Sequence, residues 1–122
     1  MIYGIGIDIC DVNRWNNMIE RSGQERCCQR ILSIEESNYL LESNPNRLAE
    51  RLAGRWALRE AFGKSLGVGL TGWNWKELRY VDGKVWVEGE LKSQLNAMNI
   101  NRLHASITHD NTMAVAMVVL EN

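Results

Sequence analysis

The chain has 122 residues, of which 45% are hydrophobic and 24% are charged, and its formal net charge at pH 7 is −1. This length predicts a single domain spanning residues 1–122, and the near-neutral charge argues against bulk nucleic-acid binding, which needs many basic contacts. The sequence shows no apolar run near the ~20 residues of a membrane span and no secretory signal pattern. We therefore expect a cytoplasmic protein that binds neither membrane nor nucleic acid.

Three cysteines, Cys10, Cys27 and Cys28, form neither an even disulfide framework nor a zinc-binding spacing. Reduced thiols that pack in the core are the expected state, and a reactive Cys27–Cys28 pair is the alternative.

The first half of the chain predicts one strand followed by helices. Residues 2–9 are rich in isoleucine and predict a strand, in which Gly4 and Gly6 indicate close approach of another backbone or of a ligand. Asp11 and Ser33 are suitable helix caps. The expected helices cover about 12–21, 24–31, 33–42 and 47–66, and a glycine-rich loop follows at 68–74.

The second half predicts mainly strands. Leu78–Val81 and Lys84–Val87 flank Asp82-Gly83, a strong hairpin signal. Strands are also expected at 102–108 and 112–120, joined by a turn at 109–111, with a helix at about 90–98. The whole predicts an α+β fold, a mostly antiparallel sheet packed against one long helix.

Three charged residues suggest a site for a phosphate-bound magnesium ion. Asp8 is expected at the end of the first strand, and Glu60 and Lys64 share one helix face because they are four residues apart. Magnesium usually binds one or two carboxylates together with substrate phosphate oxygens. The alternatives are a turn or cap role for Asp8 and a surface ion pair between Glu60 and Lys64, worth only ~0.3–0.5 kcal/mol.

Arginines recur every four residues along the long helix, at Arg47, Arg51, Arg55 and Arg59. This spacing predicts one slanted basic stripe, which would suit a ligand with several phosphates because arginine forks bind phosphate in pairs of hydrogen bonds. The residues Gly67-Val68-Gly69 would then let the backbone approach that ligand. An ordinary solvated face is the alternative.

The histidines are not expected to share a metal, because His104 and His109 fall on opposite faces of a strand. His104 is expected to pack, and His109 to contact phosphate or solvent at the turn. Three tryptophans, Trp73, Trp75 and Trp86, are expected to be exposed, as they would be near an interface.

The sequence resembles the holo-acyl-carrier-protein synthase family of small phosphopantetheinyl transferases over nearly the whole chain. The matching parts, in order and spacing, are residues 1–9, Arg14, residues 55–69 and residues 104–110. The resemblance implies a 4′-phosphopantetheinyl transferase-like fold. It also implies magnesium-dependent transfer of the 4′-phosphopantetheine arm of coenzyme A to a serine of apo acyl carrier protein. The reaction releases 3′,5′-ADP and supports fatty acid biosynthesis, and the family implies a homotrimer with active sites between subunits.

The resemblance also implies roles for individual residues. Catalytic roles fall to Asp8, Glu60 and Lys64, of which Asp8 and Glu60 would hold the magnesium ion. As a hypothesis, Glu60 removes the serine proton, directly or through a water, while Lys64 neutralises phosphate charge. The remaining matches are coenzyme-binding positions at Arg55, Lys64, Gly67, Gly69, Thr108 and His109, and a carrier-protein docking surface at Arg14, Met18 and Arg21.

The chain departs from the family at three positions: Arg59 stands where lysine is usual, Gly63 where serine is common, and Val85 where proline is frequent. These departures put coenzyme affinity in question. Two alternatives therefore stay open: another magnesium-dependent enzyme acting on a nucleotide pyrophosphate, such as a small hydrolase, and a coenzyme A-binding module without activity.

Overall fold

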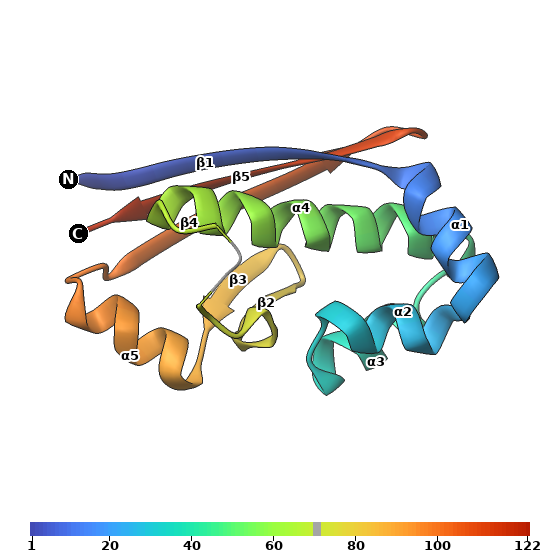
Figure 1. Ribbon diagram of the computed structural model, residues 1–122, viewed down its shortest axis with the longest axis horizontal. Helices are drawn as coiled ribbons and strands as arrows, with labels where there is room; N and C mark the ends of the chain where they lie inside the picture. The colour runs from blue at the N-terminus through green and yellow to red at the C-terminus, as the bar shows by residue number, and fades with distance from the viewer. Residues whose placement is uncertain (70–71) are drawn as a thin grey trace.

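The computed structural model describes residues 1–69 and 72–122 and shows an α+β fold (Figure 1). Strands β1 (Ile2–Asp11), β5 (Met113–Glu121) and β4 (Arg102–His109) form an antiparallel sheet in the order β1-β5-β4. A separate antiparallel hairpin pairs β2 (Leu78–Val81) with β3 (Lys84–Val87). The predicted fold class is confirmed.

The helices agree with the predicted ones to within one or two residues at each end. They are α1 (Val12–Ser22), α2 (Gln24–Ile31), α3 (Ile34–Glu42), α4 (Leu48–Leu66) and α5 (Gly89–Ala97), with short 3-10 helices at Pro45–Arg47 and Trp75–Glu77. Within the described part of the chain, no helix is both long and apolar enough to cross a membrane. Residues 70 and 71, in the middle of the predicted loop 68–74, lie outside the described residues.

Strand β1 is longer than predicted, which changes the position of Asp8. Ile9, Cys10 and Asp11 continue the ladder with β5, so Asp8 lies inside the strand, opposite Ala116. The expectation that Asp8 ends the strand is therefore wrong, and so is its alternative role as a turn or cap. The cap is Asp11, whose carboxylate accepts a hydrogen bond of 2.9 Å from the Asn13 backbone N–H.

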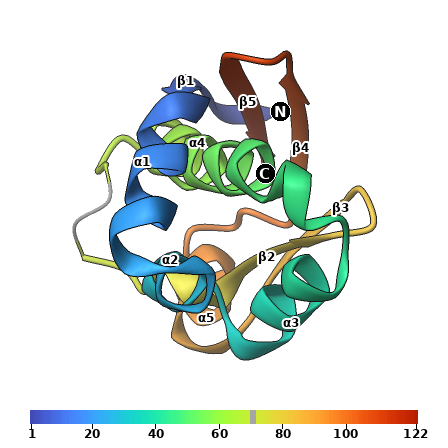
Figure 2. The ribbon, with the colours of Figure 1, turned by 90° about the vertical axis from the view of Figure 1, so that its right-hand side faces the viewer.

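Helix α4 is the centre of the molecule. In the end view of Figure 2 it lies between the β1-β5-β4 sheet and a second layer that contains α2, α3, α5 and the hairpin. Its buried residues lie on more than one side of the helix and include Leu52, Gly54, Leu58, Arg59 and Phe62. A helix with neighbours on both sides has no single buried face.

The contact between α4 and β1 depends on two glycines. A Cβ added to Gly6 would overlap the Ala61 carbonyl, 2.7 Å from its carbon, and one added to Gly4 would come within 3.0 Å of the Ser65 carbonyl carbon. Four helical residues rise about 6 Å and two strand residues span about 6.6 Å, so alternate strand positions meet successive turns of the helix. The close approach of another backbone, predicted from these glycines, is confirmed.

Because glycines face the helix, the isoleucines of β1 face outward. Ile5, Ile7 and Ile9 are 55–59% exposed, and their partners across the ladder are Val119, Met117 and Val115 of β5. The outer face of the sheet is therefore an apolar surface, which we call the isoleucine face.

The Gly6→Ala substitution is expected to destabilise the protein by about 3 kcal/mol or more, because backbone atoms of α4 cannot move aside as a side chain can. Gly54→Ala is the matched comparison, since its Cβ would meet the Cγ2 of Ile107 at 2.8 Å. We expect a smaller loss there, partly offset by the ~1 kcal/mol helix preference of alanine over glycine. Urea unfolding curves measure both, and equal losses would contradict this account.

Candidate active site

Asp8, Glu60 and Lys64 are brought together by the contact between β1 and α4. The Lys64 ammonium donates to the Asp8 carboxylate at 2.8 Å and to the Ile7 carbonyl at 3.0 Å. Asp8 is mostly buried, with 12% of its side chain exposed, whereas Lys64 is 54% exposed. Lys64 thus pairs across to the strand and not with Glu60 on its own helix, so the simple surface pair offered as an alternative is not formed.

Glu60 of α4 lies beside Asp8 of β1. Burial, the Asp8 charge and a hydrogen bond with Asp8 together raise the pKa of Glu60, and the nearby Trp56 indole and Arg14 oppose the rise. Two neighbouring carboxyl groups resist ionising together unless a cation lies between or beside them. Asp8 raises the pKa of Lys64 in turn, which keeps that amine charged.

This donor set fits a magnesium ion that also binds a phosphate. Among residues 1–69 and 72–122, no cluster of three or more histidine, cysteine or acidic side chains could hold a metal. Two carboxylates alone are too few for a closed protein site, but magnesium commonly takes one or two carboxylates and completes its shell with substrate oxygens and water.

The predicted arginine stripe is wrong. Arg59 is fully buried and Arg55 is 8% exposed, and both pair with the buried Glu36 of α3. Arg59 Nη2 lies 2.9 Å from one carboxylate oxygen of Glu36, and Arg55 Nε lies 3.3 Å from the other. Arg47 pairs with Glu50, and Arg51 donates to Ser43. These arginines do not form an exposed stripe for phosphate.

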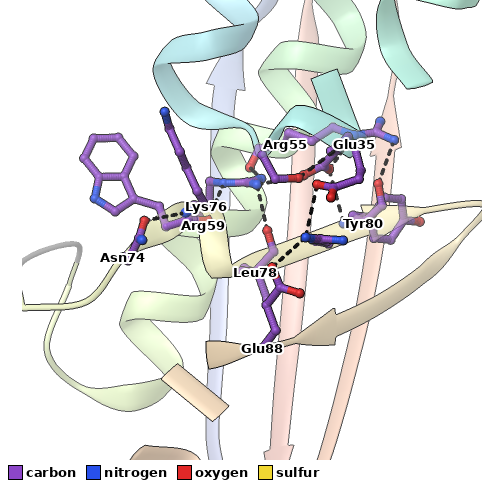
Figure 3. A network of polar contacts seen from close by, with 12 residues as sticks. Glu35, Arg55, Arg59, Asn74, Lys76, Leu78, Tyr80 and Glu88 are labelled. Carbon is purple, nitrogen blue, oxygen red and sulfur yellow. Dashed lines mark hydrogen bonds and ion pairs between the residues drawn. The ribbon is translucent and has the colours of Figure 1, made fainter. Parts of the chain in front are cut away.

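Figure 3 shows how this buried network joins α4 to the hairpin. Arg59 also donates to the backbone carbonyls of Leu78 at 2.8 Å and Trp75 at 3.2 Å, and Arg55 donates to that of Tyr80. Arg59, a departure from the family pattern, therefore acts in the core and not at the Asp8–Glu60 pair. Arg55 uses its Nε and Nη2 groups in these contacts, and its predicted coenzyme contact stays a prediction.

His109 lies near the opposite end of α4 from Lys64 within one chain. His109 Nδ1 is 3.3 Å from Glu50 in the first turn of α4, and Glu50 is 14 residues, or about 21 Å of helix, from Lys64. Thr108 is exposed at the end of the isoleucine face. His104 is exposed and contacts Glu121 at 2.5 Å, so the expectation that it packs is wrong.

The predicted docking helix carries a cavity that sequence reasoning missed. Arg14 and Met18 of α1 line a cavity of about 150 Å³ together with Trp15, Trp56 and Trp75, and with Arg30 and Ile31. The Trp56 ring lies 5.1 Å from that of Trp75, which is only half-exposed. The sequence held one indication of this cavity: Trp56 is four residues from Glu60 and so shares its helix face. Arg21 is exposed in the last turn of α1.

The cysteines are buried and unbridged. Burial raises the pKa of Cys28 to about 11 and also raises those of Cys10 and Cys27. The thiolate form needed for reactivity is disfavoured, which supports packing thiols over a reactive pair. Of the tryptophans expected at the surface, Trp86 is exposed, whereas Trp73 is half-buried like Trp75.

Comparison with known proteins gives consistent matches. Residues 4–116 match the family model of the 4′-phosphopantetheinyl transferase superfamily. The chain is 39% identical over 121 residues to a holo-[acyl-carrier-protein] synthase of Oceanobacillus iheyensis, covering 99% of this chain and 98% of the relative. The structure of the Neisseria meningitidis holo-[acyl-carrier-protein] synthase superposes with a TM-score of 0.86 at 30% identity, over 100% of both chains. The structure of a Bacillus anthracis holo-(acyl-carrier-protein) synthase in complex with CoA (3′,5′-ADP) superposes with a TM-score of 0.75 at 33% identity, and the match covers 98% of this chain and 96% of that one.

The Glu36→Gln substitution is expected to destabilise the fold by about 3–5 kcal/mol, because it leaves two buried guanidinium groups without their counter-charge. The adjacent Glu35→Gln is the matched control, since Glu35 is 64% exposed and pairs with Arg79 at 3.1 Å. Its cost should stay below about 1 kcal/mol. Thermal and urea unfolding measure the stability of both variants. Similar losses of unfolding free energy would show that the buried Glu36 contributes no more to stability than the exposed Glu35.

Proposed function

The chain belongs to the holo-[acyl-carrier-protein] synthase family of the 4′-phosphopantetheinyl transferase superfamily, and from this we propose that it transfers the 4′-phosphopantetheine arm of coenzyme A to a serine of apo acyl carrier protein. We propose that the reaction depends on magnesium, releases 3′,5′-ADP and supports fatty acid biosynthesis. The observation that carries the proposal is the convergence of Asp8, Glu60 and Lys64 from two elements. The coenzyme ligands named for the Bacillus anthracis and Helicobacter pylori relatives support it.

In this proposal each residue has a defined task. Asp8 and Glu60 would hold the magnesium ion, which would supply Lewis-acid polarisation of the phosphoryl group and charge neutralisation for the leaving 3′,5′-ADP. Glu60, whose pKa is raised by burial and by Asp8, accepts the proton of the carrier serine directly or through a water. Lys64 keeps a positive charge at the site and, being half-exposed, is free to turn toward a coenzyme phosphate.

The transfer itself is tested by incubating the protein with apo carrier protein, coenzyme A and magnesium, and then weighing the carrier. We expect a gain of one phosphopantetheine arm, its loss on chelation and its return when magnesium is restored. Glu60→Gln should lower turnover at saturating magnesium by about 10²–10⁴-fold, because it removes both a ligand and the base. Glu35→Gln is the control and should keep wild-type turnover.

The alternatives predict different products. A small hydrolase would cleave coenzyme A without any carrier protein, and a binding module would bind coenzyme A and leave both molecules unchanged. Near-wild-type turnover by Glu60→Gln would remove the proposed role of that residue while leaving the transfer reaction intact.

We also propose that the active site is completed by a second copy of the chain, in the homotrimer that the family resemblance implies. Two observations support this. The isoleucine face is an exposed apolar surface of a kind that usually marks an interface. His109 contacts Glu50, about 21 Å of helix from Lys64, and in this proposal the His109 and Thr108 that lie beside a given Lys64 come from another chain.

Complementation tests the shared site. Glu60→Gln and His109→Ala homo-oligomers should each be weakly active. Coexpressed in equal amounts, they should regain about a quarter of wild-type sites, those that combine an intact Glu60 and an intact His109 from different chains. Sedimentation should show a trimer for the wild type. Mixed oligomers that gain no activity, or a monomeric wild-type enzyme, would exclude a site shared between chains.

The carrier protein is proposed to dock on α1, at Arg14, Met18 and Arg21 and over the tryptophan-lined cavity. Arg14 lines this cavity and lies close enough to Glu60 to lower its pKa, so a carrier held there would lie next to the reactive pair. Acyl carrier proteins are acidic, which suits the basic side chains of this surface.

The Arg14→Glu substitution should raise the KM for carrier protein about tenfold or more while leaving that for coenzyme A nearly unchanged, because it reverses a charge at the surface where the carrier protein is proposed to dock. Wild-type KM for carrier should also rise with salt as the attraction is screened. Lys92→Glu, on the exposed side of α5, is the charge-matched control. An equal rise in both KM values would place Arg14 at the coenzyme instead.

A further inference from the structure

The backbone that leaves helix α4, residues 67–69, folds back onto the last turn of the helix, one turn beyond Lys64. The backbone N–H groups of Val68 and Gly69 both donate to the Gly63 carbonyl at 3.1 Å, and that of Gly67 donates to the Lys64 carbonyl at 3.0 Å. This segment contains two of the positions assigned to coenzyme binding, yet its N–H groups are used internally. Its shape, and not free amide donors, is what it offers a ligand.

The fold of this segment requires the absence of a side chain at Gly63. A Cβ there would lie 2.5 Å from the Gly69 carbonyl carbon and would overlap the carbonyl oxygen. The Gly69 carbonyl thus occupies the space where a serine side chain would begin. The departure from the family pattern at Gly63 is therefore linked to the position of residues 67–69.

Trp73 holds the same carbonyl from the other side. Its indole N–H donates to the Gly69 carbonyl oxygen at 2.9 Å. Its ring packs edge-on against Phe62, which is fully buried, with centroids 4.8 Å apart. The indole N–H of Trp73 is therefore held in place, because its ring packs against a buried side chain of α4.

We infer that Trp73 is a positioning residue for coenzyme A. By its hydrogen bond to the Gly69 carbonyl, which occupies the space left by Gly63, it fixes residues 67–69. In that conformation the segment accepts the coenzyme phosphates beside Lys64. This inference rests on the proposed function. The physical reason is that the carbonyl is held against α4, so its oxygen does not face phosphate oxygens, which it would repel. A segment fixed before binding also loses less conformational entropy when the coenzyme arrives.

The test separates the indole N–H from the ring. Trp73→Phe keeps a ring to pack on Phe62 and removes the donor. Trp86→Phe, at a 44% exposed position on β3, is the matched control. For Trp73→Phe we expect a Kd for coenzyme A, measured by calorimetry, about five- to tenfold weaker than wild type, the factor that one ordinary hydrogen bond supports. The KM for coenzyme A should rise by the same factor, with the KM for carrier protein and the melting temperature nearly unchanged.

A second variant tests the route of the effect. Gly63→Ala should weaken coenzyme A binding in the same way because its Cβ displaces the Gly69 carbonyl. Since both changes act through that carbonyl, the double variant should bind coenzyme A no more weakly than the single variant with the lower affinity. If the two changes acted independently, their fold losses in affinity would multiply.

The outcomes distinguish this inference from the proposed function. If the wild-type protein binds and transfers but Trp73→Phe binds coenzyme A as the wild type or the Trp86→Phe control does, the positioning role is overturned and the transferase stands. If Trp73→Phe raises both KM values equally, or lowers stability in proportion, Trp73 is only structural. If the wild-type protein binds no coenzyme A, the proposed function fails, and the positioning role fails with it.

Discussion

The close contact between strand β1 and helix α4 is the constraint on which the rest of the structure depends. Gly4 and Gly6 present backbone to the carbonyls of Ser65 and Ala61, and a side chain at either position would separate the two elements. The same contact places Asp8 beside Glu60 and within 2.8 Å of Lys64. The distance between the Asp8 and Glu60 carboxylates is therefore set by a backbone contact in the core, and any change in that contact would move the two carboxylates apart.

Helix α4 has different tasks on its different sides. Toward the sheet it presents small residues together with Glu60 and Lys64, and toward the second layer it presents Arg55 and Arg59, which bind Glu36 and the hairpin carbonyls. A buried ion pair contributes little net stability compared with apolar packing, but breaking one is costly, so such networks favour one arrangement over others. The network therefore fixes the hairpin and α3 against the helix whose opposite side carries Glu60 and Lys64.

The sequence predicted the elements well, and it singled out Asp8, Glu60 and Lys64, which the fold brings together, because strand alternation, caps and motif spacing are local signals. It failed where the answer depended on distant partners. Nothing in the four-residue spacing of the arginines shows that Glu36, 19 and 23 residues away from Arg55 and Arg59, is buried between them. Nor could an isoleucine-rich strand reveal that its glycines face inward and its isoleucines outward, because that depends on what packs against it. The cavity at Trp56 required the same missing information.

The glycine contact has a consequence for how far relatives of this chain can diverge. Carbonyl oxygens and α-carbons are the same in every amino acid, so a spacing built from them is insensitive to substitutions in the surrounding core. Repacking of leucines, valines and aromatics can accumulate over generations while the reactive geometry is inherited unchanged. Substitution is not tolerated at the two glycines of β1, where even a single added methyl group would separate the Asp8 and Glu60 carboxylates.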